Sequence, residues 1–185
     1  SFSQSQLDQL ARTIVDDYGI TANDRYVSIM NLSHAHGQGF YWAARLAACD
    51  MKFLSLNHIR DLPRYRPTFV TAIPGILKIV GNLDLEHLRF IRSASAAMPA
   101  SLYHDLAQKF QVPVIEAFGM TEALSHCFTN PLNGEQRLGT VGMPSGIEAK
   151  IQNDRLMIKG PCVCHNDWYD IGDLAQQDQH GYYKI

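Results

Sequence analysis

Cysteine is scarce in this sequence, and its four residues are too few for a disulfide framework. They also lack the Cys-x-x-Cys pair that is typical of structural zinc sites. The four are Cys49, Cys127, Cys162 and Cys164. Both features favour a reducing compartment, and since no signal peptide is recognisable either, we expect a cytoplasmic protein.

Charge of one sign and long apolar runs are also missing. The 16 basic and 18 acidic residues are spread along the chain and give a formal net charge of −2. Without a basic run, the sequence has no electrostatic footprint for nucleic acid or for an anionic membrane surface. The longest apolar stretches are interrupted by Arg45, Lys52 or Pro74, so we expect no membrane span.

Several well-known catalytic signatures are absent as well. The sequence has no Gly-x-Ser-x-Gly elbow and no Gly-x4-Gly-Lys-Ser/Thr phosphate loop, which disfavours a serine hydrolase and a P-loop NTPase. Gly37-Gln38-Gly39 lacks the third glycine of a dinucleotide-binding fingerprint. No pattern predicts an oligomeric state.

Apolar residues, by contrast, are plentiful: they make up 46% of the 185 residues, enough for a large core. Ser3 and Gln6 form a capping box before a helical pattern that Gly19 ends. Short apolar strands then alternate with helices up to about residue 130, which predicts an α/β fold with a largely parallel sheet flanked by helices. The expected strands are 25–32, 51–56, 68–71, 88–91 and 112–115, and the expected helices are 39–48 and those that Pro74 and Pro99 open.

The pattern changes after Asn130, where glycines divide the chain into short pieces without a helical period. Residues 147–152 alternate as a half-buried strand does, and residues 155–159 form a second strand across an Asn153-Asp154 turn. We therefore expect an α/β part over residues 1–130 and a small β-rich, distorted barrel-like subdomain over residues 131–185.

The first candidate site is Phe118-Gly119-Met120-Thr121-Glu122, directly after a predicted buried strand. In open α/β sheets ligands bind beyond the carboxyl ends of the strands. Gly119 permits a sharp turn, Thr121 offers a hydroxyl to a phosphate, and Glu122 offers a carboxylate to Mg²⁺. On spacing alone, an ordinary strand–helix loop with a Thr-Glu cap is the favoured interpretation of the same residues.

Two further segments have the right chemistry for a nucleotide. Asp173 follows Gly172 at a predicted loop edge, where its carboxylate could accept hydrogen bonds from a ribose diol, although a self-bonded turn is an alternative. The small residues 93–99 would let a flat ring or an acyl chain lie against the backbone, although tight strand–helix packing also requires small residues.

A fourth segment, His34-Ala35-His36-Gly37, contains a His-x-His pair. A metal would need a third ligand that nothing nearby supplies. A loop histidine that gates a pocket, or a structural histidine, is the preferred interpretation.

In their order and spacing, these segments together resemble the adenylate-forming (AMP-binding) superfamily, which includes acyl- and aryl-CoA ligases, luciferases and the adenylation domains of peptide synthetases. The resemblance covers nearly the whole chain. The segments that carry it are His34 to Gly37 (HxxG), Ser95 to Pro99 (GGAP-like), Phe118 to Glu122 (YGxTE-like), Gly139 to Pro144 (GxxGxP) and Tyr169 to Asp173 (aromatic-x-TGD).

The resemblance implies the latter part of a large N-terminal domain and an ATP-dependent activation of a carboxylic acid. The acid would become an acyl-adenylate with release of pyrophosphate, and the acyl group would then pass to CoA or to the pantetheine of an acyl carrier protein. A histidine at the HxxG position favours acyl or aryl acids over amino acids.

The family's residue roles carry over position by position. Thr121 would contact phosphate and Glu122 would hold Mg²⁺. Asp173 would bind the ribose of ATP or AMP. The acyl pocket would include His34 at its mouth, with Gly37 and Met120. The residues that would flank the adenine are Ser95, Ala96, Ala97, Phe118 and Gly119.

The chain also departs from the family pattern. The phosphate loop expected before Ser1 and the small domain with the catalytic lysine expected after Ile185 are absent from it. Ile171 replaces the usual threonine, and the stretch Pro161–Asn166 is shorter than in the family. We therefore expect a fragment that is inactive in adenylation by itself. A non-catalytic nucleotide- or acyl-binding module and a structural α/β scaffold are the alternatives.

Overall fold

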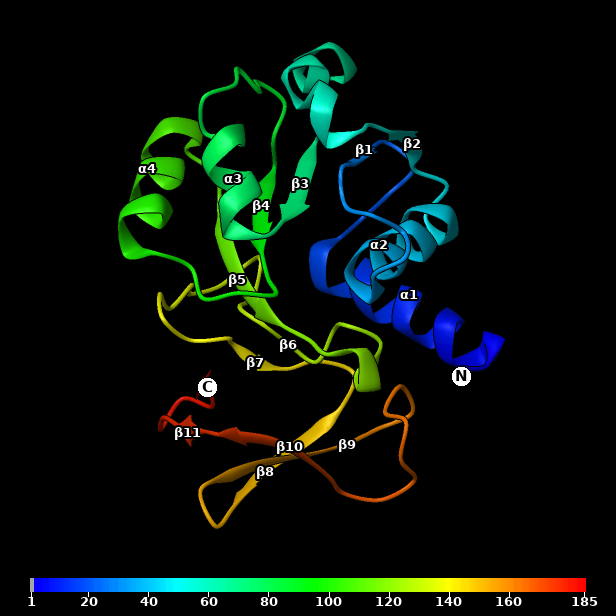
Figure 1. The fold of residues 1–185 in the computed structure, drawn as a ribbon, viewed down its shortest axis with the longest axis vertical. Helices are drawn as coiled ribbons and strands as arrows, with labels where there is room; N and C mark the ends of the chain where they lie inside the picture. Colours follow the sequence, from blue (N-terminus) through cyan, green and yellow to red (C-terminus); the bar gives the residue numbers. More distant parts are fainter. Residues whose placement is uncertain (1) are drawn as a thin grey trace.

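The structure, a computed structural model, describes residues 2–185. Seven strands form its main sheet in the order β2-β1-β3-β4-β5-β6-β7. β1 to β5 run parallel, whereas β6 and β7 are added antiparallel at one edge (Figure 1). The bounds are Arg25–Ser28 (β1), Asp50–Phe53 (β2), Phe69–Ala72 (β3), Phe90–Ser93 (β4), Val114–Phe118 (β5), Phe128–Thr129 (β6) and Met143–Pro144 (β7).

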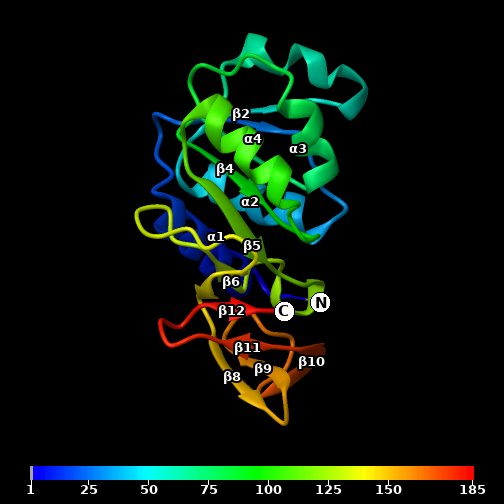
Figure 2. The ribbon, with the colours of Figure 1, turned by 90° about the vertical axis from the view of Figure 1, so that its left-hand side faces the viewer.

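Helices cover both faces of this sheet, and α3 and α4 lie over one of them (Figure 2). Neighbouring residues of each parallel strand point to opposite faces, so Tyr26 packs against α1 and α2 while Val27 packs on the side of α3 and α4. The predicted fold class, a largely parallel sheet flanked by helices with β-rich structure after it, is confirmed. The helices are Gln4–Tyr18 (α1), Ala35–Leu46 (α2), Leu56–Tyr65 (the 3-10 helix η1), Pro74–Val80 (α3) and Ala100–Phe110 (α4).

The core under α1 and α2 is built from stacked rings. Tyr18 stacks on Phe90, Phe90 on Phe69, and Phe69 on Tyr26, with ring centroids 5.0–5.1 Å apart. The four side chains are fully or almost fully buried. Each ring buries a large apolar area, so this column fixes α1 against β4, β3 and β1.

Local signals set most helix ends as expected. The Ser3–Gln6 capping box opens α1, and Gly19 ends it in a left-handed conformation. Pro74 stands in the first turn of α3, and Pro99 precedes α4. The expected helix at 39–48 is α2, and it begins earlier, at Ala35, with His34 as its N-cap.

The remaining strands form a smaller β part below the main sheet (Figure 1). β8, β9 and β10 make an antiparallel sheet in the order β10-β9-β8, and β11 pairs with β12. The predicted Asn153-Asp154 turn joins β8 to β9 with positive φ at both residues. The bounds are Glu148–Gln152 (β8), Arg155–Lys159 (β9), Tyr169–Leu174 (β10), Gln176–Gln177 (β11) and Tyr183–Lys184 (β12).

The predicted division of the chain at residue 130 stays a prediction. By strand pairing, β7 still belongs to the main sheet, and the first strand of the smaller sheets is β8. Across residues 2–185, the helices are too short or too polar for any of them to cross a bilayer.

Asp24 ties together the chain just before three parallel strands. Arg89 donates two hydrogen bonds to its carboxylate, at 2.8 and 2.9 Å, and Thr68 donates a third at 2.7 Å. Burial alone would raise the pKa of Asp24, but these bonds and one from the Thr21 amide outweigh it and lower the pKa.

Asp24→Asn is expected to lower the free energy of unfolding by about 2 kcal/mol at neutral pH, because the buried network loses its negative charge and one of its two acceptor oxygens. Since the folded pKa lies below the unfolded value of about 3.9, this stabilisation is present above that pH and is lost as pH falls through the folded pKa. Urea unfolding between pH 2 and 7 measures it. Asp84→Asn, at an exposed carboxylate, should change stability by less than about 0.5 kcal/mol; a pH-independent Asp24 effect would refute the explanation.

Candidate functional site

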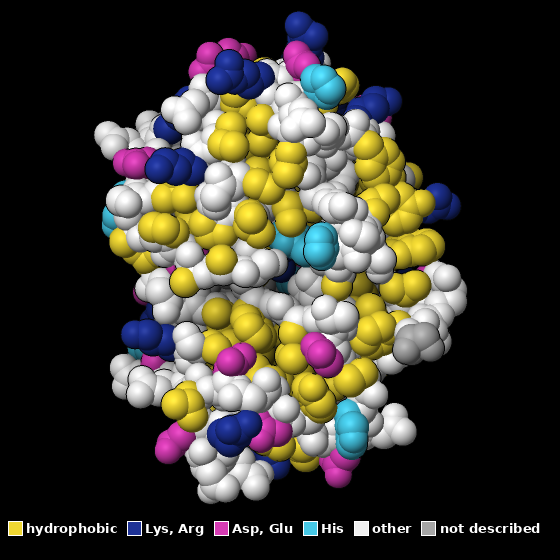
Figure 3. Space-filling model, in the orientation of Figure 1, with side chains coloured by type: hydrophobic (Ala, Val, Ile, Leu, Met, Phe, Trp, Pro, Cys, Tyr) yellow, Lys and Arg dark blue, Asp and Glu magenta, His cyan; other side chains and the backbone are white. Residues whose placement is uncertain are grey.

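A pocket of about 320 Å³ opens at the carboxyl ends of β4 and β5. This is the edge of a parallel sheet at which ligands bind. In the space-filling view a groove crosses the molecule between its upper α/β part and its lower β part (Figure 3). The lining residues are Ser93, Ser95 to Met98, Glu116 to Gly119, Gly139 to Val141, and Ile185.

The structure brings the residues predicted to flank an adenine into this one pocket. Ser95, Ala96 and Ala97 form one side of it, and their small side chains leave room for a flat group. Phe118 and Gly119 line it from the end of β5. Their role in binding a nucleotide stays a prediction, but their convergence is a property of the fold.

Gly119 has a steric reason to be glycine. A Cβ there would lie 2.1 Å from the carbonyl carbon and oxygen of Ser125, because the chain folds back on itself after β5. Two backbone hydrogen bonds hold the fold-back, from Ser125 to the Met120 carbonyl and from Cys127 to the Phe118 carbonyl. This close contact fixes the positions of Met120, Thr121 and Glu122, the next three residues, which are predicted to be catalytic or substrate-binding.

Those three residues lie beside the pocket rather than in its lining. Thr121 is exposed and Glu122 half-buried in the short 3-10 helix η2 (Thr121–Ala123), and Met120 packs against the core of the β part. The Glu122 carbonyl accepts a hydrogen bond from the Cys164 amide at 2.7 Å. Within residues 2–185 no three potential metal ligands gather, so Glu122 fits Mg²⁺ only as a single carboxylate that shares the ion with substrate phosphates.

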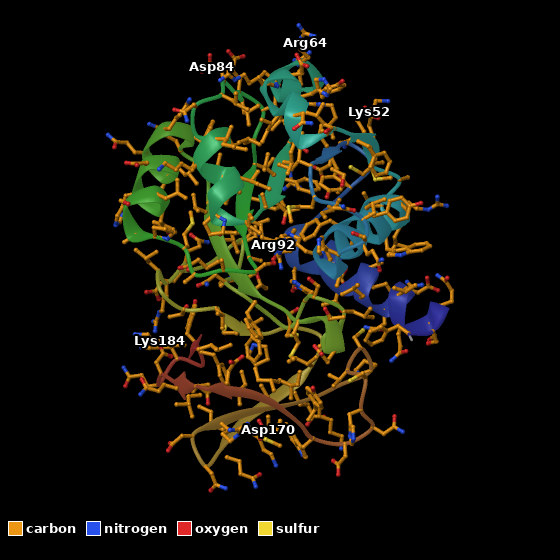
Figure 4. The ribbon with its side chains drawn as sticks, viewed as in Figure 1. Lys52, Arg64, Asp84, Arg92, Asp170 and Lys184 are labelled. Atoms are coloured by element: carbon orange, nitrogen blue, oxygen red, sulfur yellow. The ribbon has the colours of Figure 1, made fainter. Side chains whose placement is uncertain are left out.

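Asp173 lies on β10, where the sequence predicts a loop edge, and it is exposed. It does not line the pocket. The next residue, Leu174, shares a shallow cavity with Ile185, and Ile185 also lines the pocket. The neighbouring Asp170 (Figure 4) is engaged with Arg155 at 2.7 Å, whereas the Asp173 carboxylate has no hydrogen-bond partner in the described part of the chain.

His34 and Gly37 are not in the pocket either. His34 is the exposed N-cap of α2, and its side chain makes no capping bond. Gly37 is buried, and a Cβ there would lie 2.5 Å from the Asn31 carbonyl oxygen, which gives this glycine a packing reason. Their assignment to an acyl pocket stays a prediction.

The histidine that reaches the pocket is His36, whose Nδ1 lies 3.3 Å from the Ser95 hydroxyl. Sequence reasoning left it in the His-x-His pair without a role of its own. A signal was present, because His36, Gly39, Phe40 and Ala43 follow the helical spacing of a buried face.

Behind the pocket lies a cluster around Arg92, which is fully buried at the centre of the molecule (Figure 4). Its guanidinium donates to the Tyr18 hydroxyl at 2.9 Å and lies 5.1 Å from the Phe40 ring. We call Arg92 and its hydrogen-bond partners the Arg92 cluster. The partners are Tyr18, His36, Thr71 and His126.

Burial and the Arg92 charge together keep the histidines of this cluster neutral. Burial, the Arg92 charge and His126 lower the pKa of His36 to about 3. Burial and Arg92 also lower the pKa of His126, against the opposing effect of Asp17. Neither imidazole therefore adds a second positive charge beside the guanidinium.

Two further polar residues line the pocket: Glu116, which was missed from the sequence, and Ser93, which was included only as a member of the small-residue segment 93–99. The Glu116 carboxylate accepts a hydrogen bond from the Gly139 amide at 2.7 Å, and burial raises its pKa against the amides of Gly139 and Met98. The Ser93 hydroxyl is buried and has no hydrogen-bond partner among the described residues. An unpaired buried hydroxyl costs about 1–3 kcal/mol, which a ligand atom could recover.

Comparison with known proteins decides the family. Residues 3–164 match the AMP-binding enzyme family over most of the chain. This chain belongs to the AMP-binding enzyme family. The expectation from the sequence motifs is thereby confirmed.

The proteins similar to this chain include CoA ligases. Oxalate–CoA ligase of Arabidopsis thaliana is 29% identical over 225 residues, covering 99% of this chain and 44% of the ligase. Oxalate–CoA ligase of Saccharomyces cerevisiae is 32% identical over 152 residues, covering 76% of this chain and 28% of the ligase. The chain thus spans less than half the length of these relatives.

Solved structures agree in fold. Apo MatB from Rhodopseudomonas palustris matches with a TM-score of 0.90 at 23% identity, over 100% of this chain and 44% of MatB. O-succinylbenzoate coenzyme A synthetase (MenE) from Bacillus subtilis, in complex with ATP and magnesium ion, matches with a TM-score of 0.86 at 22% identity, over 98% of this chain and 45% of that chain.

The alignment lengths also show that this chain is shorter than the matching part of a relative. The match to the Arabidopsis ligase extends over 225 residues, although this chain has 185, so the ligase contains residues without a counterpart here. The family match ends at Cys164, within the stretch Pro161–Asn166 that we expect to be shortened.

Proposed function

We propose that this chain is part of an ATP-dependent ligase that converts a carboxylic acid to an acyl-adenylate and passes the acyl group to CoA. The observation that carries the proposal is the pocket beyond β4 and β5, which gathers the small residues and Phe118 in a member of the AMP-binding enzyme family. The relatives named as CoA ligases support the reaction type.

In this proposal, Ser95 to Ala97 and Phe118 hold the adenine between them, because both line the pocket. Asp173, an exposed carboxylate on β10, accepts hydrogen bonds from the ribose. Glu122 holds Mg²⁺, and Thr121 donates its hydroxyl to a phosphate. Mg²⁺, when bound, would stabilise the charge that builds on the phosphate oxygens as the carboxylate attacks.

The acid that we propose carries a second acidic group. The relatives act on oxalate, sulfoacetate, malonate and 2-succinylbenzoate, each of which has one besides the group that is activated. His34, Gly37 and Met120 are the residues proposed to border the acid. Transfer to an acyl carrier protein and a cytoplasmic location stay predictions, while the non-catalytic module and the scaffold gain no support from the relatives.

Calorimetric titration of AMP into the chain tests the nucleotide site. Asp173→Ala is expected to weaken AMP binding about tenfold or more, because a carboxylate that bridges a ribose diol is lost. Glu122→Gln should leave metal-free AMP binding unchanged, since its proposed partner is Mg²⁺. If the Asp173→Ala variant bound AMP as tightly as the unaltered chain does, the proposal that Asp173 binds the ribose would be wrong. If the unaltered chain did not bind AMP, the proposed function would be contradicted for this chain.

A further inference from the structure

The Arg92 cluster constrains where two protons must be. A guanidinium has only donor groups, so any atom that it approaches at hydrogen-bond distance must accept. Arg92 Nη1 lies 3.1 Å from His36 Nε2, and Arg92 Nη2 lies 3.4 Å from His126 Nδ1. Where Arg92 donates to these ring nitrogens, both are unprotonated, and in a neutral imidazole the proton is then on the other nitrogen.

The contacts of the other nitrogens agree with this placement. His126 Nε2 lies 2.6 Å from the Asp17 carboxylate, which can accept a hydrogen bond from an Nε2–H group. His36 Nδ1 faces the Ser95 hydroxyl at 3.3 Å, and with the proton on Nδ1 it donates to that hydroxyl. Thr71 Oγ1 accepts from Arg92 at 3.3 Å and lies 2.7 Å from His36 Nε2, so in this arrangement the Thr71 hydroxyl shares the Nε2 lone pair with Arg92.

The consequence reaches the pocket through Ser95. Its oxygen already accepts from His36, so its own proton remains to be donated, and Ser95 lines the pocket in a left-handed backbone conformation. Ser93, two residues earlier, lines the same pocket with a buried hydroxyl that has no partner in residues 2–185. Both serines therefore belong to the lining of one pocket, the Ser93 hydroxyl as a buried group without a partner among the described residues.

We infer that Ser93 and Ser95 form a two-hydroxyl site for a hydrogen-bond acceptor of the bound ligand, and that Arg92 and His36 are positioning residues that make Ser95 a donor. The acceptor is a carboxylate oxygen of the acid or a ring nitrogen of the adenine. This inference rests on the proposed function for its ligand but not for the proton positions.

The proton positions can be measured without any ligand. A long-range ¹H–¹⁵N NMR spectrum of the chain at pH 7 distinguishes the two neutral tautomers of each histidine. We expect the Nδ1–H form for His36 and the Nε2–H form for His126, while the exposed His104 serves as an internal reference. A protonated Nε2 on His36, or a positively charged ring, would overturn the inference.

Matched variants test the effect on binding. Ser93→Ala and Ser95→Ala are each expected to weaken binding about threefold to tenfold for either AMP or oxalate, titrated separately. The ligand that is affected identifies the source of the acceptor. If neither serine variant changed either affinity, the two-hydroxyl site would be refuted.

Two substitutions of His36 separate positioning from simple packing. Asparagine places an N–H near the position of Nδ1 and keeps the donor to Ser95, whereas glutamine reaches the position of Nε2 and keeps only the acceptor for Arg92. His36→Gln should therefore weaken binding as Ser95→Ala does, and His36→Asn should not. In the Ser95→Ala background His36→Gln should add nothing; additive losses would refute the positioning role.

Failure of the inference and failure of the proposed function are distinguishable. If the unaltered chain bound neither AMP nor oxalate, the proposed function and the two-hydroxyl site would both be refuted. The placement of the protons would still be decided by the NMR spectrum alone.

Discussion

Replacing Gly142 by alanine is expected to abolish stable folding, with a loss of more than about 4 kcal/mol in the free energy of unfolding. Gly142 has a φ of +87°, and a Cβ there would lie 2.0 Å from the carbonyl carbon and 2.1 Å from the oxygen of Thr129. Both contacts are with backbone of β6, which cannot move aside without breaking the sheet edge.

Gly139→Ala is the matched control, because Gly139 also has a positive φ, +79°, but nothing lies within 4 Å of its added Cβ. Only the left-handed conformation is then penalised, at about 1–2 kcal/mol. Urea unfolding followed by circular dichroism measures both variants. Equal losses for the two would show that the close approach to Thr129 does not decide the effect.

The position of Gly142 also matters for the pocket. Tyr183 accepts a hydrogen bond from the Val141 amide and donates one to the Gly142 carbonyl, both at 2.8 Å. These two bonds hold the loop that contributes Gly139 to Val141 to the pocket wall. A variant that shifts Gly142 is therefore expected to displace this wall of the pocket, although Gly142 itself is not a predicted nucleotide contact.

Much of the fold was predictable because its signals are local. Helix ends follow from single residues such as Gly19, Pro74 and Pro99, and the β8–β9 hairpin follows from Asn153-Asp154. The alternation of side chains within a strand is likewise a property of a few consecutive residues. Such features can be predicted without knowing the tertiary contacts of the rest of the chain.

Features that depend on distant residues were not predictable in the same way. β7 returns to the main sheet by pairing with β6, although its surroundings in the sequence are typical of the β part. Residues 169–174 form β10 because β9 supplies a partner, and the segment by itself has the glycine and acidic residues of a turn. Strand pairing decided both cases.

The residues of the candidate site also differ in whether a local motif or a contact with distant residues reveals them. The small residues from Ser95 to Ala97 and the Phe118-Gly119 turn were recognised because they lie in short motifs. Glu116 was missed, since its importance comes from the Gly139 amide rather than from its neighbours in sequence, and Ser93 was recognised only as one of the small residues 93–99. The role of Arg92 is the extreme case, because its partners come from α1, α2, β3 and the loop before β6.

Filling the pocket is expected to have the largest effect on ligand binding. Ala97 lines the pocket with one of its smallest side chains, so Ala97→Trp would place an indole where we propose that the adenine lies. We expect AMP affinity to fall at least about a hundredfold, which corresponds to about 2.7 kcal/mol. Because Ala97 is exposed, stability should change little.

Ala100→Trp is the matched control, since Ala100 is also exposed but stands at the start of α4, outside the pocket lining. It should keep the AMP affinity of the unaltered chain within about twofold, because a surface substitution away from the site leaves the pocket as it is. Calorimetric titration of AMP into both variants, with thermal unfolding to confirm that each is folded, measures the difference. Undiminished AMP binding by a folded Ala97→Trp variant would place the nucleotide elsewhere and would leave the small residues from Ser95 to Ala97 with a packing role only.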